Sequence, residues 1–109
     1  PGDKHMVVHE GCLALRDPEA DDDVVPSINK LFTSVAAEYG DQSLGVILTG
    51  AGDDGAVGAK AISDAGGFCL AESDKTAVFS EMPAAAETLG GIHETLGLSE
   101  LVRCLKEHI

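Results

Sequence analysis

The chain has 109 residues, 44% of them hydrophobic, and a formal net charge of −12. This length and composition suffice for one buried core, so we expect a single domain over residues 1–109. Surfaces that bind nucleic acid or anionic membranes need clustered Lys and Arg. Seven basic residues against nineteen acidic ones therefore argue against both kinds of partner.

The cysteines favour a reducing compartment. There are three, Cys12, Cys69 and Cys104, with no Cys-x-x-Cys pair among them. This pattern disfavours a disulfide framework or a thiolate metal site. Cys69 and Cys104 lie in apolar stretches and are predicted to be small core residues. Neither a signal peptide nor a run of 18 apolar residues is visible, so we expect a cytoplasmic protein that does not insert into membranes.

The first forty residues predict a hairpin, a loop and a helix. Two short strands are expected within His5–Leu15, joined by a tight turn near Gly11. The acidic segment Arg16–Asp23 is expected to be a solvated loop. Pro26 suits the first turn of a helix and Gly40 suits its exit. The apolar positions between them share one helical face, namely Ile28, Leu31, Phe32, Val35, Ala36 and Tyr39.

The remainder alternates between strands and helices. Leu44–Thr49 and Phe68–Ala71 are short apolar runs typical of parallel strands buried on both faces. Helices are predicted over Ala56–Ala65 and Pro83–Leu89, and an edge strand over Ile92–Leu96. A last helix is expected to be capped by Ser99, with Leu101, Val102 and Leu105 facing inward.

This alternation predicts an α/β fold of three layers around a mostly parallel, doubly wound sheet, preceded by a β-hairpin. The alternation begins late in the chain. We therefore expect a partial sheet that lacks its N-terminal strands, with an exposed strand edge that favours self-association.

The glycine-rich turn Gly50–Gly55 follows a strand and precedes a helix, where α/β proteins place their sites. Three interpretations remain open on the residues alone. The turn fits the Gly-x-Gly-x-x-Gly pattern of dinucleotide sites, with Glu72 as a ribose-binding acid, but Asp53 and Asp54 would repel a pyrophosphate. One aspartate could simply cap the following helix. Alternatively, one carboxylate could orient a catalytic histidine.

Four motifs in order resemble the protein-glutamate methylesterases of bacterial chemotaxis (the CheB type). The first is Pro-Gly-Asp-Lys-His-Met at residues 1–6, and the second is Pro-Ser-Ile-Asn-Lys-Leu-Phe at 26–32. The third, Gly-Val-Ile-Leu-Thr-Gly-Ala-Gly-Asp-Asp-Gly-Ala at 45–56, resembles the family signature Gly-Val-Ile-Leu-Thr-Gly-Met-Gly-x-Asp-Gly-Ala. The fourth is Ala-Val-Phe-Ser-Glu-Met-Pro at 77–83.

The resemblance implies a Ser-His-Asp triad that hydrolyses glutamyl methyl esters on the cytoplasmic helices of chemoreceptors. It implies that Asp54 is the triad aspartate and that Ala51, Gly52 and Met82 contribute to the oxyanion or substrate site. It also implies an upstream receiver domain in the intact protein, and neither cofactor nor metal.

Several residues depart from the family pattern. Ala51 stands where the family has methionine, Glu81 where it has glycine, and Val25 where a basic residue is common. The serine and the histidine of the family triad lie upstream of the Pro-Gly-Asp motif, at which this chain begins. The chain alone is therefore expected to be inactive by the triad route.

Substitutes within the chain are not evident. No Gly-x-Ser-x-Gly elbow is present, and Ser27 is more simply a helix-capping residue. His5 and His9 lie four residues apart, but on a strand this spacing is about 13 Å, too far for one metal ion. His93 and His108 are expected at the surface. A catalytically inactive binding module remains the alternative to an enzyme.

Overall fold

A computed structural model of the chain describes residues 2–108, without the side chain of His108. Pro1, which opens the first motif, and Ile109 lie outside the described residues, as does the predicted surface position of the His108 side chain. Within the described part of the chain, no helix is both long and apolar enough to cross a bilayer.

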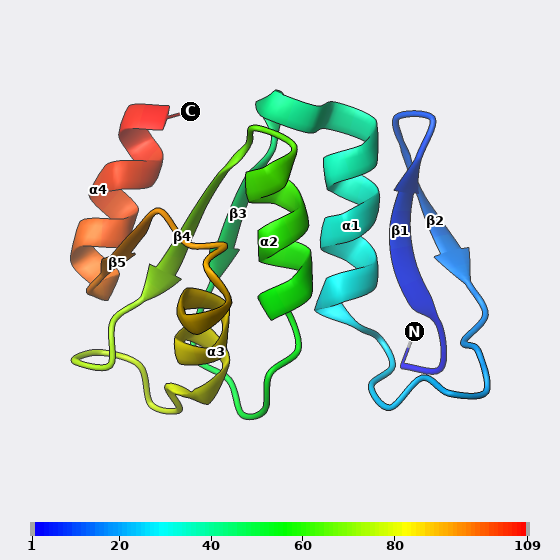
Figure 1. Cartoon of the computed structure of the whole chain (residues 1–109), viewed down its shortest axis with the longest axis horizontal. Helices are drawn as coiled ribbons and strands as arrows, with labels where there is room; N and C mark the ends of the chain where they lie inside the picture. The colour runs from blue at the N-terminus through cyan, green and yellow to red at the C-terminus, as the bar shows by residue number, and fades with distance from the viewer. Residues whose placement is uncertain (1, 109) are drawn as a thin grey trace.

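The strands form two separate sheets, which confirms the predicted α/β fold with an N-terminal hairpin (Figure 1). The hairpin is antiparallel and pairs β1 (His5–His9) with β2 (Cys12–Arg16). The other sheet is parallel, in the order β3-β4-β5. Its strands are β3 (Leu44–Ile47), β4 (Phe68–Glu72) and β5 (Glu94–Leu96).

In residues 2–108, four α-helices and one short 3₁₀ helix connect and cover these strands. They are α1 (Ile28–Tyr39), η1 (Gly40–Gln42), α2 (Ala56–Asp64), α3 (Glu81–Leu89) and α4 (Leu98–His108). Helices α2 and α3 form the crossovers β3-α2-β4 and β4-α3-β5, and they contact each other as well as the sheet. Helix α1 lies between α2 and the hairpin and packs on both (Figure 1).

The main core lies between α2 and the parallel sheet. Ile47, Ile62 and Cys69 are at most 2% exposed there. Burial raises the pKa of the Cys69 thiol to about 11, so this cysteine behaves as a small apolar residue, as predicted. Cys104 is only half-buried. Strand alternation turns Leu70 away from Cys69, and α4 packs on this second face of β4 with its buried Leu101.

The strand predicted over Leu44–Thr49 differs from the one observed. It ends at Ile47, and Leu48 is already 47% exposed. The prediction that it is buried on both faces is wrong, because Leu44 and Val46 are only half-buried. Helix α4 packs on β4 rather than on β3, and so it leaves this face of β3 partly uncovered.

The last helix also begins differently from its prediction. Ser99 lies inside α4, which starts at Leu98, so Ser99 is not its cap. The Thr76 hydroxyl instead accepts the backbone N–H of Leu98 at 3.1 Å. Val102 is 47% exposed and does not face inward, because it follows the buried Leu101 directly and points about 100° away from it. Leu105 is half-buried.

Helix α1 uses its predicted apolar face unevenly. Ala36 is buried, and Ile28 and Phe32 pack against the core next to α2. Tyr39 is 45% exposed at the C-terminal end, where Gly40 ends the helix at a φ of +54°. Val7 of β1 is buried as well. The face is therefore divided between α2 and the hairpin.

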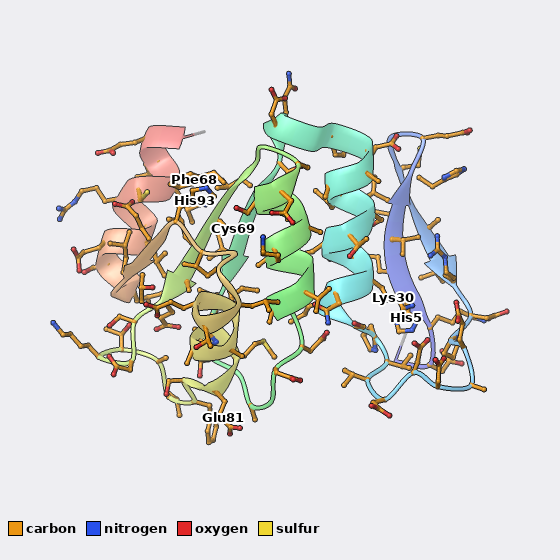
Figure 2. The ribbon with its side chains drawn as sticks, viewed as in Figure 1. His5, Lys30, Phe68, Cys69, Glu81 and His93 are labelled. Atoms are coloured by element: carbon orange, nitrogen blue, oxygen red, sulfur yellow. The ribbon has the colours of Figure 1, made fainter. Side chains whose placement is uncertain are left out.

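His93 is exposed, as predicted, yet it stabilises the sheet (Figure 2). Its ring stacks on Phe68 with the centroids 4.7 Å apart. The ring Nδ1 of His93 accepts the backbone N–H of Cys69 at 3.1 Å. The backbone N–H of His93 donates to the Cys69 carbonyl at 2.9 Å. His93 thus extends the β4-β5 pairing by one residue before the start of β5.

A substitution at Gly91 tests how closely the segment before β5 packs against α2. A Cβ at Gly91 would lie 2.6 Å from the backbone nitrogen of Lys60. We therefore expect Gly91→Ala to lower the free energy of unfolding by about 1–3 kcal/mol in urea denaturation. Gly2→Ala is the control, since a Cβ there meets nothing within 4 Å. Equal stability of the two variants would contradict this packing.

Candidate functional site

The glycine-rich turn Gly50–Gly55 leaves the carboxyl end of β3 and is held by the segment that precedes α3. The Gly50 N–H donates to the Phe79 carbonyl at 2.8 Å, and the Gly50 carbonyl accepts the Met82 N–H at 3.1 Å. A Cβ at Gly50 would lie 2.9 Å from the Met82 sulfur, so a side chain there would require this half-buried methionine to shift. Ala51 and Gly52 are exposed beyond this point.

The half-buried Asp54 holds the N-terminus of α1. Its Oδ2 accepts the backbone N–H of Ile28 at 2.7 Å. Its Oδ1 accepts the Ser27 hydroxyl at 2.8 Å and the Asn29 N–H at 3.2 Å. The N-terminus of a helix carries free N–H groups and a positive partial charge, and an aspartate satisfies both.

Asn29 holds the neighbouring helix in return. Its side-chain oxygen accepts the N–H groups of Gly55 at 3.0 Å and Gly58 at 2.8 Å, at the N-terminus of α2. The interpretation that an aspartate of the turn caps the helix that follows it is therefore wrong. Gly55 is the N-cap of α2 and has a φ of +103°, and Asp54 caps α1 instead.

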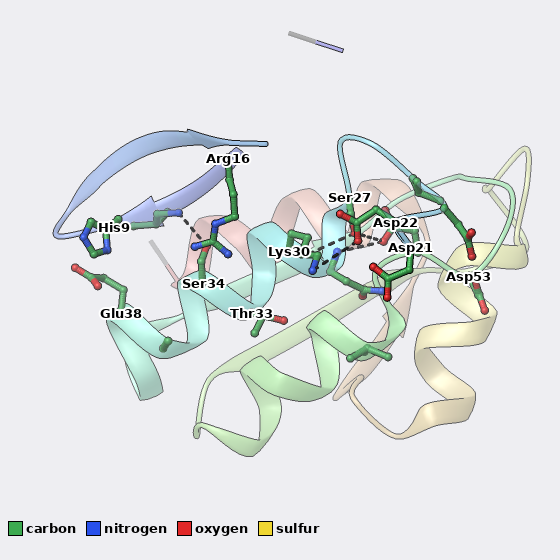
Figure 3. A pocket seen from close by; sticks show the side chains of 17 residues that line it. His9, Arg16, Asp21, Asp22, Ser27, Lys30, Thr33, Ser34, Glu38 and Asp53 are labelled. Atoms are coloured by element: carbon green, nitrogen blue, oxygen red, sulfur yellow. Dashed lines mark hydrogen bonds and ion pairs between the residues drawn. The ribbon is translucent and has the colours of Figure 1, made fainter. Parts of the chain in front are cut away.

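Three donors among the described residues reach Asp54, whereas a carboxylate offers about four acceptor positions. One position, on Oδ2, is left for a further donor. Asp54 lines a groove of about 710 Å³ between α1, the hairpin and the loop after it (Figure 3). The polar and charged lining of the groove includes Arg16, Asp21, Asp22, Asp23, Lys30 and Asp53.

The acidic segment Arg16–Asp23 is exposed, as expected of a solvated loop, except at the half-buried Asp22. The Asp22 carboxylate lies 2.8 Å from Nε2 of the buried His5, and it accepts the Glu19 N–H at 2.8 Å. The Glu19 N–H and then the His5 ring hold the pKa of Asp22 below its usual value. Lys30 of α1 lies 3.7 Å from the same carboxylate. The sequence did not predict these contacts of Asp22 with His5 and Lys30.

Ser27, His5 and Asp54 meet at this point, but they do not form a catalytic triad. A triad base accepts the proton of the serine hydroxyl. Here the Ser27 hydroxyl donates directly to Asp54, and Nδ1 of His5 accepts the backbone N–H of Ser27 at 3.1 Å. Ser27 is the N-cap of α1, as predicted, and its hydroxyl accepts the Lys30 N–H at 3.4 Å.

Glu72 does not fit the role of a ribose-binding acid. It is 5% exposed at the end of β4. One of its oxygens accepts the Thr49 N–H at 3.1 Å, and the other accepts the Thr76 hydroxyl at 2.8 Å. These contacts join the carboxyl ends of β3 and β4. The dinucleotide interpretation thus loses the acid on which it depended.

The described residues contain no cluster of His, Cys, Asp and Glu side chains that could hold a metal ion. His5 and His9 lie at the two ends of β1, and His9 is exposed beside Glu10.

Comparison with known proteins gives the context of this site. The family described as CheB methylesterase matches residues 1–105. The chain belongs to the CheB methylesterase family. Its match to the family includes the Asp54 turn, the Ser27 helix start and the His5 strand.

Curated relatives agree with this assignment. The chain is 42% identical over 107 residues to a protein of Anaeromyxobacter dehalogenans named protein-glutamate methylesterase/protein-glutamine glutaminase 2. It is 40% identical to the corresponding protein 1 of Myxococcus xanthus. These matches cover 98% and 93% of the chain but only 31% and 30% of the relatives. The chain thus spans about a third of the length of the curated relatives it matches.

A solved structure confirms the fold. The CheB methylesterase catalytic domain of Thermotoga maritima superposes with a TM-score of 0.92 at 28% sequence identity. The superposition covers the whole chain and 60% of that domain. Both sheets and their helices therefore have the arrangement found in a methylesterase catalytic domain.

Removing the Asp54 carboxylate tests its capping role. Asp54→Ala leaves the Ile28 and Asn29 N–H groups and the Ser27 hydroxyl without their acceptor. We expect a loss of about 1–3 kcal/mol in the free energy of unfolding, measured with urea. The neighbouring exposed Asp53 is the control, and Asp53→Ala is expected to change stability by less than about 0.5 kcal/mol. Similar losses for both would exclude a specific cap.

Proposed function

We propose that the protein carrying this chain hydrolyses glutamyl methyl esters on chemotaxis receptors, and that Asp54 is the aspartate of its Ser-His-Asp triad. The observation that carries the proposal is the Asp54 carboxylate itself. It is held by three donors, has one acceptor position left and lines a groove. Membership of the CheB methylesterase family supports the proposal.

The proposed role of Asp54 is to orient the imidazole ring of the triad histidine. An ionised carboxylate that accepts a histidine Nδ1–H fixes the tautomer in which Nε2 can take the serine proton. It also stabilises the imidazolium that forms as the serine attacks the ester carbonyl. A rigid carboxylate serves this purpose, and the fixed N-terminus of α1 provides the rigidity.

Within the proposed site, Ala51 and Gly52 supply backbone N–H groups to the oxyanion, and Met82 lines the substrate site. Their position at the carboxyl end of β3 supports this, as does the close contact between Gly50 and Met82. Alanine at position 51 keeps the N–H but removes the bulk of the family's methionine. Glu81 begins α3 and places a negative charge at its N-terminus, where a glycine would place none.

The names of the curated relatives add a second reaction, the deamidation of protein glutamine. The same proposed machinery suits both reactions. In each, a serine would attack the side-chain carbonyl and water would then release a glutamate carboxylate. The leaving group is methanol from the ester and ammonia from the amide, and the imidazolium would donate the proton that either one needs.

We further propose a cytoplasmic location, methylated receptor helices as the substrate and a receiver domain upstream in the intact protein. Self-association through the uncovered strand edge of the isolated chain stays a prediction. A clean monomer in equilibrium sedimentation at high concentration would contradict it. The binding-module alternative has no support in the relatives, whose names are those of enzymes.

The test uses the complete gene product and methyl-esterified receptor. Asp54→Asn keeps the shape of the side chain but offers an amide, so we expect kcat for methanol release to fall by about 10⁴-fold. Asp41→Asn is the matched control, because Asp41 is exposed in η1 at the opposite end of β3. Full activity of Asp54→Asn would overturn the proposal.

Ser27→Ala tests whether Ser27, rather than the serine of the proposed triad, is the nucleophile. Because the Ser27 hydroxyl serves Asp54 as a donor, we expect its loss to lower kcat by about tenfold or less, as one supporting hydrogen bond would. A loss as large as that of Asp54→Asn would instead make Ser27 a candidate nucleophile. The isolated chain is expected to release no methanol.

A further inference from the structure

His5 is an almost fully buried histidine with both ring nitrogens engaged. It lies on β1, is 1% exposed and faces the start of α1 beside Lys30 (Figure 2). Nε2 is 2.8 Å from Oδ2 of Asp22, and Nδ1 is 3.1 Å from the backbone nitrogen of Ser27. The triad proposed above does not use this residue.

The two contacts select one tautomer. A backbone N–H is always a donor, so Nδ1 must present its lone pair to Ser27. The Asp22 carboxylate is an acceptor, so Nε2 must carry the hydrogen. Both requirements agree on a neutral ring with the hydrogen on Nε2. Asp22 is itself held by the Glu19 N–H, so it presents a fixed acceptor to the ring.

Ser27 transmits the position of the ring to Asp54. Its N–H is fixed by His5, and its hydroxyl donates to Asp54 at 2.8 Å. The next two peptide N–H groups, of Ile28 and Asn29, donate to the same carboxylate. A rotation of the Ser27 peptide would therefore displace all three donors that hold Asp54.

We propose that His5 is a positioning residue for Asp54, acting through the Ser27 N–H that its Nδ1 accepts. The inference rests on the catalytic role of Asp54 proposed above. It assigns His5 no proton transfer, because its Nδ1 is occupied by a peptide N–H and its Nε2 by Asp22. What His5 supplies is the orientation of the first turn of α1, on which the direction of the Asp54 lone pairs depends.

Two conservative variants of the complete gene product separate the ring nitrogens. The amide oxygen of His5→Asn lies close to the place of Nδ1 and can still accept the Ser27 N–H. The longer His5→Gln places its amide near Nε2, where it reaches Asp22 but not Ser27. We expect His5→Gln to lower kcat about 10–100-fold with KM changed less than about threefold, and His5→Asn to restore most of that loss.

The free energy of unfolding of both variants is measured alongside. A purely structural role predicts that activity follows stability and that neither amide is favoured. Equal kcat values for the two variants, or a kcat that follows stability alone, would overturn the inference. Asp54→Asn is assayed in parallel. If it stays active, the proposed function fails; if it is inactive while both His5 variants are active, only the role of His5 fails.

A measurement on the unsubstituted protein covers the case in which the variants do not fold. The ¹⁵N chemical shifts of the histidine side chains distinguish the two neutral tautomers and the imidazolium. We expect His5, assigned through its contact to the Ser27 N–H, to be neutral with the hydrogen on Nε2. A hydrogen on Nδ1 of His5 would leave the Ser27 N–H without an acceptor and would overturn the inference.

Discussion

The carboxylate of Asp54 lies at the centre of the hydrogen bonds that join α1 and the hairpin to α2 and the parallel sheet. It accepts three hydrogen bonds from the first turn of α1, while Asn29 in that turn accepts two from the start of α2. The turn before α2 thus satisfies free N–H groups of α1, and α1 satisfies free N–H groups at the start of α2. Because α1 also carries the hairpin, this reciprocal capping joins the hairpin unit to the parallel sheet.

Asp54 does not cap α2, the helix that follows the glycine-rich turn, but it caps α1, and this role is compatible with the proposed orientation of a histidine. Capping and orienting a histidine both need an ionised carboxylate with fixed direction. Three donors from one helix turn provide that direction and leave one acceptor position. A residue that stabilises the fold can therefore also be ready for catalysis, and stability and activity of Asp54 variants must be measured separately.

Polar contacts around the site extend well beyond the turn. Glu72 joins the ends of β3 and β4, and the Thr49 hydroxyl accepts the Phe79 N–H at 2.7 Å. On the other side, Asp22 and His5 hold Ser27. Every buried polar side chain in the described residues has a partner. Around Asp54, the directions of the Asp22, Ser27 and Asp54 side chains are thus set by hydrogen bonds within the protein.

Local sequence patterns predicted the order of the strands and helices and the hairpin, whereas Asp54 was singled out by the resemblance of its motif to a known family. Apolar runs and helical spacing follow from short-range geometry, so these predictions needed no long-range information. The ends of elements were less well predicted. Ser99 is a typical capping residue, yet the cap of α4 comes from Thr76, which is 22 residues away from Leu98.

Only the tertiary structure decided which partners the polar residues have. Asp54 lies 27 residues from Ser27, Asn29 lies 29 from Gly58, and His5 lies 22 from Ser27. No periodicity in the sequence encodes such pairs, because they form where separate elements meet after the core has packed. The sequence, through its family motif, pointed to Asp54, and the packing of α1 against α2 and the hairpin determined which groups hold its carboxylate.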